Sequence, residues 1–401
     1  MSLIVLVAAA TLVAPGESKD QTSWTISAER VYTATGKVIE EGSVTVEDGK
    51  IRSVSKGGSG DLECYAITPG LIDLSVRIER DVTSIEQSRE ITPEKRIAVA
   101  LDWFDEAWKR EARSGVTTVM INPLERQVVG GLSVVVKTAG ENAQERTVKA
   151  DSALYGAIGS APSQSNHPAF GRPDDFYSRR PTTRMGVEWE WRKAFFDAAM
   201  AREDKRLAGP GTLELQKALA GDLPVFIQAW TTQDIRTAVF LKEELAREGL
   251  GKLRLVVDAA AEAWKEPELL VRSATAAILP PFSATGRSGD GAFFALDTAK
   301  VLAERGVTVA LSGHGARAAS ERLCYQPGHA MRGGLAFDAA LAAVTINPAR
   351  IAGIDKRVGS LESGKDADLV LWSGPPFEAT SAVIGVLVDG RLVLDPRTQN
   401  K

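Results

Sequence analysis

The chain has 401 residues, of which 44% are hydrophobic and 25% are charged, a composition typical of a globular protein with room for a large core. Its formal net charge is -4 and its lysines and arginines are dispersed, so the sequence offers no clustered basic face for nucleic acid. Two cysteines exclude a disulfide framework or a zinc ribbon, and a single bridge between Cys64 and Cys324 stays open.

The N-terminus carries a targeting signal. An apolar run over residues 3–13 is followed by Ala14, Pro15 and Gly16, with no positive charge before it. This length suits the core of a signal peptide and is too short for a membrane span. We expect residues 1–16 to be a signal peptide and the protein to be periplasmic or extracellular, with a cytoplasmic protein as the alternative. No later stretch is long and apolar enough to predict a membrane span.

Short alternating runs at both ends of the chain predict β-structure. Residues 24–56 contain the pair Asp48-Gly49, and residues 383–393 contain Asp389-Gly390. Asp-Gly pairs tolerate the positive φ angles of a two-residue hairpin turn. The sequence therefore predicts hairpins near each end of the chain.

Between these ends, helix and strand signals alternate, which predicts an α/β fold. A helix is expected over residues 91–114, with Pro93 near its start, and another over residues 231–248, before Gly249. The buried strands that we expect are residues 71–76, 115–121, 223–230, 253–260 and 307–315. Residues 160–187 are irregular and predict either a lid over a site or a solvated surface loop.

Several phrases carry a family resemblance: Thr68-Pro-Gly-Leu-Ile-Asp-Leu-Ser-Val-Arg77, Gly115-Val-Thr-Thr118, Thr345-Ile-Asn-Pro-Ala-Arg350 and Gly359-Ser-Leu-Glu-Ser-Gly-Lys-Asp-Ala-Asp-Leu-Val370. Through them the chain resembles the amidohydrolase superfamily of metal-dependent hydrolases, and the Gly-Gly segment at 128–137 resembles its imidazolonepropionase-like branch. The resemblance implies a (β/α)8 TIM barrel over residues 68–357, with a composite β-sandwich formed by residues 24–67 and 358–395. It also implies hydrolysis of carbon-nitrogen bonds other than peptide bonds, with one or two divalent metals, usually zinc.

The metal-ligand positions of that family are substituted in this chain. The positions that align with them are Ser75 and Arg77 on the first strand, Gln228 on the fifth, Ala259 on the sixth and His314 on the eighth. A guanidinium stays protonated and repels a cation, and a metal site needs at least three converging donors. We therefore expect no metal cofactor. The sequence does not place the ligand of the fourth strand.

Two chemical alternatives stay open. His314 and Ser75 could form a metal-free catalytic pair, because the eighth strand of a closed barrel lies beside the first. Alternatively, His314, Asp258 and Gln228 could hold a weak metal. The residues expected to bind substrate are Arg77, Gln228 and Asp258.

The sequence thus favours a degenerate amidohydrolase-superfamily protein that is non-catalytic or binds a small molecule at the barrel mouth. The alternative is an active hydrolase of a cyclic amide or similar small molecule. The expected partners are a second copy of the chain or an active paralogue. Asp73 and Glu79 are expected to be structural ion-pair partners of Arg77.

Overall fold

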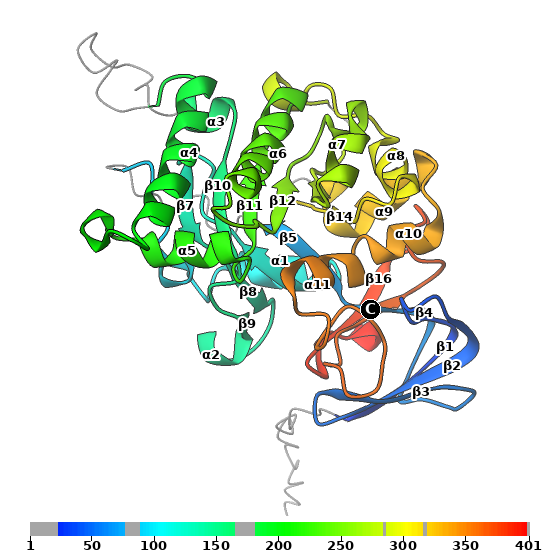
Figure 1. Ribbon diagram of the computed structural model, residues 1–401. Coiled ribbons are helices and arrows are strands. Elements are labelled where there is room, and N and C mark those ends of the chain that lie inside the picture. Colours follow the sequence, from blue (N-terminus) through cyan, green and yellow to red (C-terminus); the bar gives the residue numbers. More distant parts are fainter. Residues whose placement is uncertain (1–22, 77–88, 165–180, 284–285, 316–318, 399–401) are drawn as a thin grey trace, which may run out of the picture.

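The computed structural model describes residues 23–76, 89–164, 181–283, 286–315 and 319–398 (Figure 1). The expected signal peptide, residues 1–16, lies outside the described residues, and so do Arg77 and Glu79. Among the described helices, none combines the length and the apolar character that crossing a membrane requires. Cys64 and Cys324 are free thiols, so they do not form the bridge that the sequence left open.

Strands from both ends of the chain form one seven-stranded sheet, coloured blue and red in Figure 1. Its order is β17 (Arg391–Leu394), β16 (Val383–Val388), β15 (Leu369–Trp372), β4 (Leu62–Pro69), β1 (Trp24–Tyr32), β2 (Val38–Glu47) and β3 (Lys50–Lys56). The two ends of the chain meet where β15 runs antiparallel to β4. All four residues of the Asp48-Gly49 and Asp389-Gly390 turns have positive φ, which confirms the two predicted hairpins.

The middle of the chain forms two further sheets and confirms the α/β class. The six-stranded sheet has the order β14 (Val309–Leu311), β13 (Ala276–Leu279), β12 (Leu255–Asp258), β11 (Val225–Gln228), β10 (Leu154–Ala157) and β7 (Val129–Leu132). The four-stranded sheet has the order β5 (Leu71–Val76), β6 (Val116–Ile121), β8 (Val134–Lys137) and β9 (Thr147–Lys149).

The six-stranded and the four-stranded sheet are connected in two places. Only Ser133 separates β7 from β8, so one nearly continuous strand passes from one sheet to the other. Strands β10 to β14 are parallel, whereas β7 runs antiparallel to β10 and β8 antiparallel to β6. On the other side, Asp73 of β5 accepts hydrogen bonds from Ser312 and Gly313, just beyond β14. The sheets are therefore mixed, and within the described residues no strand ladder closes them into the all-parallel barrel that we expected.

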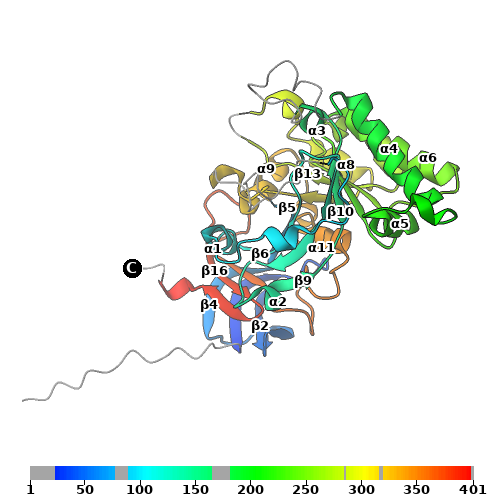
Figure 2. The same cartoon turned by 90° about the vertical axis from the view of Figure 1, so that its left-hand side faces the viewer.

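Helices surround these sheets, and Figure 2 shows α4, α5 and α6 together on one side of the molecule. The helices are α1 (Glu106–Arg113), α2 (Ala143–Arg146), α3 (Ser160–Gln164), α4 (Arg184–Met200), α5 (Thr212–Ala220), α6 (Thr232–Arg247), α7 (Pro267–Arg272), α8 (Thr298–Glu304), α9 (Gln326–Arg332), α10 (Phe337–Ala342) and α11 (Ile346–Ala352).

The predicted helix over residues 231–248 is confirmed as α6, whereas the one over residues 91–114 is too long. Ile91 and Arg96 form β-bridges to the β7 strand, and between them lies a turn in which the Lys95 amide donates to the Thr92 carbonyl, so this stretch is not helical. The helix α1 begins only after Asp105, whose carboxylate accepts a hydrogen bond from the amide of Ala107. Tertiary pairing overrides the helical spacing here.

A shared core holds the two central sheets together. One buried apolar cluster takes Met120 and Val135 from the four-stranded sheet and Phe226, Val256 and Ile278 from the six-stranded sheet. Hydrogen bonds from Ser75 of β5 and Tyr155 of β10 to Asp258 of β12 bring these three strands together in the interior, where the candidate site lies.

Candidate functional site

Asp258, the last residue of β12, is the centre of a fully buried polar cluster. Its Oδ2 atom accepts a hydrogen bond from the Ser75 hydroxyl at 2.8 Å and another from the Tyr155 hydroxyl at 2.7 Å. Its Oδ1 atom accepts from the backbone amide of Ala259 at 2.8 Å. Ser75 and Tyr155 are themselves fully buried, so the cluster is shielded from solvent.

The strand register explains why these side chains meet. Asp258 pairs with Gln228 of β11, and Gln228 pairs in turn with Ala157 of β10. Parallel strands end at the same edge of a sheet, so residues near their carboxyl ends converge. Tyr155 lies two residues before Ala157, and its long side chain reaches Asp258. Ser75 reaches the same carboxylate from β5 of the other sheet.

Asp73 forms a second buried polar centre beside the first. Its Oδ1 atom accepts from the Ser312 hydroxyl at 2.6 Å and from the Ser75 amide at 3.0 Å, and its Oδ2 atom accepts from the Gly313 amide at 2.7 Å. Burial raises the pKa of Asp73 to about 6, and the nearby Asp258 charge adds to the rise, although the three hydrogen bonds oppose it.

Gln228 ends β11 and His314 follows β14, two strands of the six-stranded sheet between which β12 and β13 lie. The His314 amide donates to the Ser312 hydroxyl at 2.9 Å, and its imidazole meets the Trp230 ring edge-on with 6.1 Å between ring centroids. His314 and Ala259 both have positive φ, at 53° and 54°, so the chain turns sharply where their strands end. Gln228 is 1% exposed, and its Nε2 atom has no hydrogen-bond partner within the described part of the chain.

The structure brings together some of the predicted site residues. Ser75 and Asp258 are in direct contact, and Gln228 is the strand neighbour of Asp258. The Ser75 hydroxyl donates to Asp258, so its proton is not directed at His314 in this arrangement. The predicted Ser75 and His314 pair stays a prediction. The expected ion pairs of Asp73 and Glu79 with Arg77 lie outside the described residues.

Sequence reasoning missed Tyr155 and Ser312. Tyr155 lies on β10, the strand that precedes β11 in the chain. A tyrosine inside a short apolar run is the signal that was available, because a buried tyrosine hydroxyl needs a hydrogen-bond partner. Ser312 follows β14 directly and could have been inferred from its place beside Gly313.

The hydrogen-bond donors around Asp258 indicate whether its carboxylate could bind a divalent cation. Three protons, from Ser75, Tyr155 and the Ala259 amide, point at its two carboxylate oxygens. A cation bound to those oxygens would face these protons unless the donors turned away. Ala259 has no donor side chain. Within the described ranges, no three histidine, cysteine or acidic side chains are grouped to hold a metal ion.

Residues near the two ends of segment 160–187, which we predicted to be either a lid or a surface loop, bind one carboxylate. Ser160, at the start of α3, donates its hydroxyl to Asp290 Oδ2 at 2.5 Å, and Arg184, at the start of α4, donates to Asp290 Oδ1 at 2.8 Å. Arg184 also binds Asp234 of α6 at 2.9 Å. Arg184, Asp290 and Glu262 line a cavity of about 620 Å³ on this side of the molecule. Residues 165–180, with Arg172, Arg179 and Arg180, lie outside the described residues.

Comparison with known proteins gives the class of this fold. The chain is similar in structure to an amidohydrolase from Thermotoga maritima MSB8, with a TM-score of 0.81, 26% sequence identity and coverage of 92% of this chain and 99% of that one. It also shares its fold with molinate hydrolase, with a TM-score of 0.55, 15% identity and coverage of 92% and 94% of the two chains.

Sequence comparison points to the same class. The model of the amidohydrolase family matches residues 266–393. Amidohydrolase tasK of Hapsidospora irregularis is 24% identical over 89% of this chain, which spans 40% of the length of that protein. Together these matches support the amidohydrolase superfamily as the family of this chain.

Proposed function

We propose that this chain is a metal-free, catalytically degenerate member of the amidohydrolase superfamily, most like the imidazolonepropionase-like branch. On this proposal the two central sheets are a modified (β/α)8 barrel over residues 68–357, and residues 24–67 with 358–395 are a composite β-sandwich. The protein binds a small molecule near the strand ends instead of hydrolysing it, alone, as a homo-oligomer or paired with an active paralogue. Export to the periplasm or the extracellular space is part of the same proposal.

The observation that carries this proposal is the set of donors around Asp258. A carboxylate that receives two hydroxyl protons and one amide proton is already stabilised without a cation. Replacing these donors with a metal would require Ser75 and Tyr155 to give up two buried hydrogen bonds to a charged group. The aligned residues Ala259 and Gln228 would not supply the imidazoles that the family uses.

Metal analysis of the full-length protein tests the proposal. We expect purified protein, incubated with excess zinc and then dialysed, to retain far less than one metal ion per chain by inductively coupled plasma mass spectrometry. A chain with Asp258→Ala should retain the same amount, since the background is adventitious. About one zinc ion per wild-type chain that is lost in Asp258→Ala would overturn the proposal and favour a hydrolase with a weak metal at Asp258, Gln228 and His314.

A metal-free hydrolase is the second candidate, favoured by the contact between Ser75 and Asp258. Here Ser75 attacks the carbonyl carbon of an ester, Asp258 or His314 accepts the hydroxyl proton, and the Gln228 amide donates to the developing oxyanion. The tetrahedral intermediate then expels the alcohol, which takes up that proton, and water hydrolyses the acyl-serine to the acid and free Ser75. We expect no such turnover of an activated ester. Ester hydrolysis that persists in a chelator and disappears in Ser75→Ala would establish this candidate instead.

A further inference from the structure

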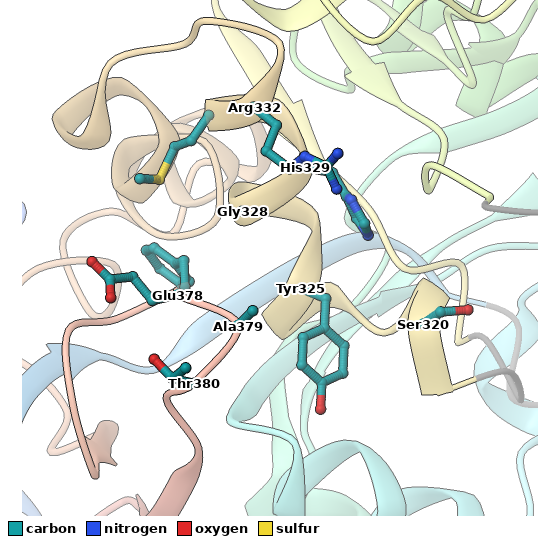
Figure 3. A pocket seen from close by; sticks show the side chains of 10 residues that line it. Ser320, Tyr325, Gly328, His329, Arg332, Glu378, Ala379 and Thr380 are labelled. Atoms are coloured by element: carbon teal, nitrogen blue, oxygen red, sulfur yellow. The ribbon is translucent and has the colours of Figure 1, made fainter.

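A groove lies between residues 320–332, which include α9, and the loop 373–382 that joins β15 to β16 (Figure 3). It consists of a larger cavity of about 830 Å³ and an adjoining cavity of about 180 Å³. The two cavities share Tyr325, Phe377 and Glu378 as lining residues. We call the whole the α9 groove. Its larger part has the size of a typical small-molecule site.

The walls of the larger cavity are mainly apolar and aromatic. Tyr325 is 46% exposed, although its ring is a large hydrophobic surface, and Met331 lines the same cavity. Phe377 is buried and held in place by Trp372, with 5.2 Å between ring centroids and an interplanar angle of 75°. A planar apolar ligand would thus meet one fixed aromatic wall and one accessible aromatic side chain.

The smaller cavity is cationic and contains polar atoms without partners. Arg113 and Arg322 line it, and neither forms an ion pair with a carboxylate among the residues that the structure describes. The Nε atom of Arg322 is buried and lacks a hydrogen-bond acceptor, and the buried hydroxyl of Ser381, whose residue is 9% exposed, also lacks a partner. Burying such groups without partners is unfavourable, so an acceptor that enters the cavity would be bound favourably.

The other titratable groups that line the groove do not cancel this positive charge. The buried Glu111 lies near Cys324, but it lines neither cavity and forms an ion pair with Arg110. Burial raises the pKa of the Cys324 thiol to about 12, so the thiol is neutral. Burial also lowers the pKa of His329, and the neighbouring Arg332 lowers it further. Figure 3 shows His329 and Arg332 together on one side of the larger cavity, with Glu378 on the opposite side. Glu378 is exposed, so water screens its charge.

We propose that the α9 groove binds a small aromatic carboxylate, with its ring against Tyr325 and Phe377 and its carboxylate on Arg322 and Ser381. The planar guanidinium can donate two parallel hydrogen bonds to a carboxylate, and the serine hydroxyl can donate a third. This site is separate from Asp258 and is lined by none of the residues aligned with the family's metal ligands. It therefore goes beyond the proposed function and stands whether or not Asp258 binds a metal.

Calorimetric titration of the full chain with naphthalene-2-carboxylate tests this site, with naphthalene-2-carboxamide as the neutral analogue of the same shape. We expect the carboxylate to bind at least tenfold more tightly than the amide. Arg322→Gln should weaken carboxylate binding about tenfold or more and leave amide binding unchanged. Arg305→Gln is the matched control, because Arg305 is an exposed arginine paired with Glu268 elsewhere on the surface. It should bind both probes as the wild type does.

Equal affinity for the two probes, or unchanged carboxylate binding by a folded Arg322→Gln chain, would contradict the proposal. If thermal melting shows that Arg322→Gln does not fold, Ser381→Ala decides the matter, because it removes one small hydroxyl. It should weaken the carboxylate several-fold more than the amide, and no difference would overturn the proposal. All titrations are repeated with a chelator, which should change nothing. Binding of the carboxylate in the α9 groove is thus tested independently of metal binding at Asp258.

Discussion

Lys137, at the end of β8, and Asp258, at the end of β12, are both fully buried, but they belong to polar clusters of different kinds. The Lys137 Nζ atom lies 2.6 Å from Asp368 Oδ2 and 3.1 Å from both Asp366 Oδ2 and Asp389 Oδ1. This cluster joins the four-stranded sheet to the segments that flank β15 and β16. The described donors to Asp258 are instead hydroxyls and a backbone amide.

The pKa values of the two clusters reflect this difference. Burial alone would lower the pKa of Lys137, but the three carboxylates raise it on balance. Burial alone would raise the pKa of Asp366, but Lys137, Lys50 and Arg357 lower it. Burial and Asp368 together still raise the pKa of Asp389. In the second buried polar centre, beside the Asp258 cluster, the pKa of Asp73 rises to about 6. A buried cation thus fixes a charged state at Asp366, whereas neutral donors leave Asp73 able to change its charge near neutral pH.

Removing the buried cation should have the largest effect. Lys137→Met leaves three acidic groups without their shared partner, and we expect it to lower the free energy of unfolding by about 3–5 kcal/mol, the usual loss when a buried pair is broken. Urea denaturation followed by circular dichroism measures this loss. Lys193→Met is the control, since Lys193 forms an exposed ion pair with Asp197 and should change stability by less than about 0.5 kcal/mol. A loss below about 1 kcal/mol in Lys137→Met would show that the buried cation stabilises the fold no more than a neutral donor does, and would contradict the difference between the two clusters.

Removing one hydroxyl from the other cluster should have a smaller effect. Tyr155→Phe deletes a single donor to Asp258 with little change in shape, and we expect a loss of about 2 kcal/mol, in the range for hydrogen bonds to charged groups. Ser75→Ala should cost a similar amount. In the double variant the two losses should not add, because both hydroxyls donate to the same oxygen atom. Strict additivity in the same denaturation assay would contradict a shared acceptor.

The pH dependence of stability should have opposite signs at Asp73 and at Asp366. Asp73 has a folded pKa of about 6, above its ordinary value of 3.8, so the folded chain binds more protons than the unfolded chain between these pH values. Its contribution therefore favours folding at low pH and is lost as the pH rises from about 4 to 6, by about 3 kcal/mol. The lowered pKa of Asp366 gives a contribution that is present above its unfolded pKa and is lost as the pH falls through its folded pKa.

Stability measured from pH 3 to 7 checks these signs. Asp73→Asn should flatten the decrease between pH 4 and 6, and Asp366→Asn should flatten the loss below pH 4. The same slope in wild type and Asp73→Asn between pH 4 and 6 would show that Asp73 is not protonated near neutral pH.

Local patterns predicted the parts of the fold that depend on short stretches of chain. The Asp48-Gly49 and Asp389-Gly390 turns follow from the need for positive φ, and α6 follows from helical spacing that ends before Gly249. The bridges that Ile91 and Arg96 form to β7 were missed because β7 lies more than thirty residues away in the chain.

The candidate site was predictable only where family alignment named a residue. The alignment named Ser75 and Gln228, whereas Asp258 was proposed as a substitute ligand beside the aligned Ala259, and the structure brings Ser75, Gln228 and Asp258 together. The role of Tyr155 was not predictable from local pattern, because its contact with Asp258 joins residues 103 positions apart. The same is true of Ser312 and Asp73, which are 239 positions apart.

A crystal structure of the full chain soaked in zinc, with anomalous data collected at the zinc edge, tests the central claim most directly. We predict no anomalous peak within bonding distance of Asp258, with the Ser75 and Tyr155 hydroxyls still donating to its Oδ2 atom. A strong peak at about 2 Å from an Asp258 oxygen, with either hydroxyl turned away, would contradict the account and identify a metal-dependent hydrolase.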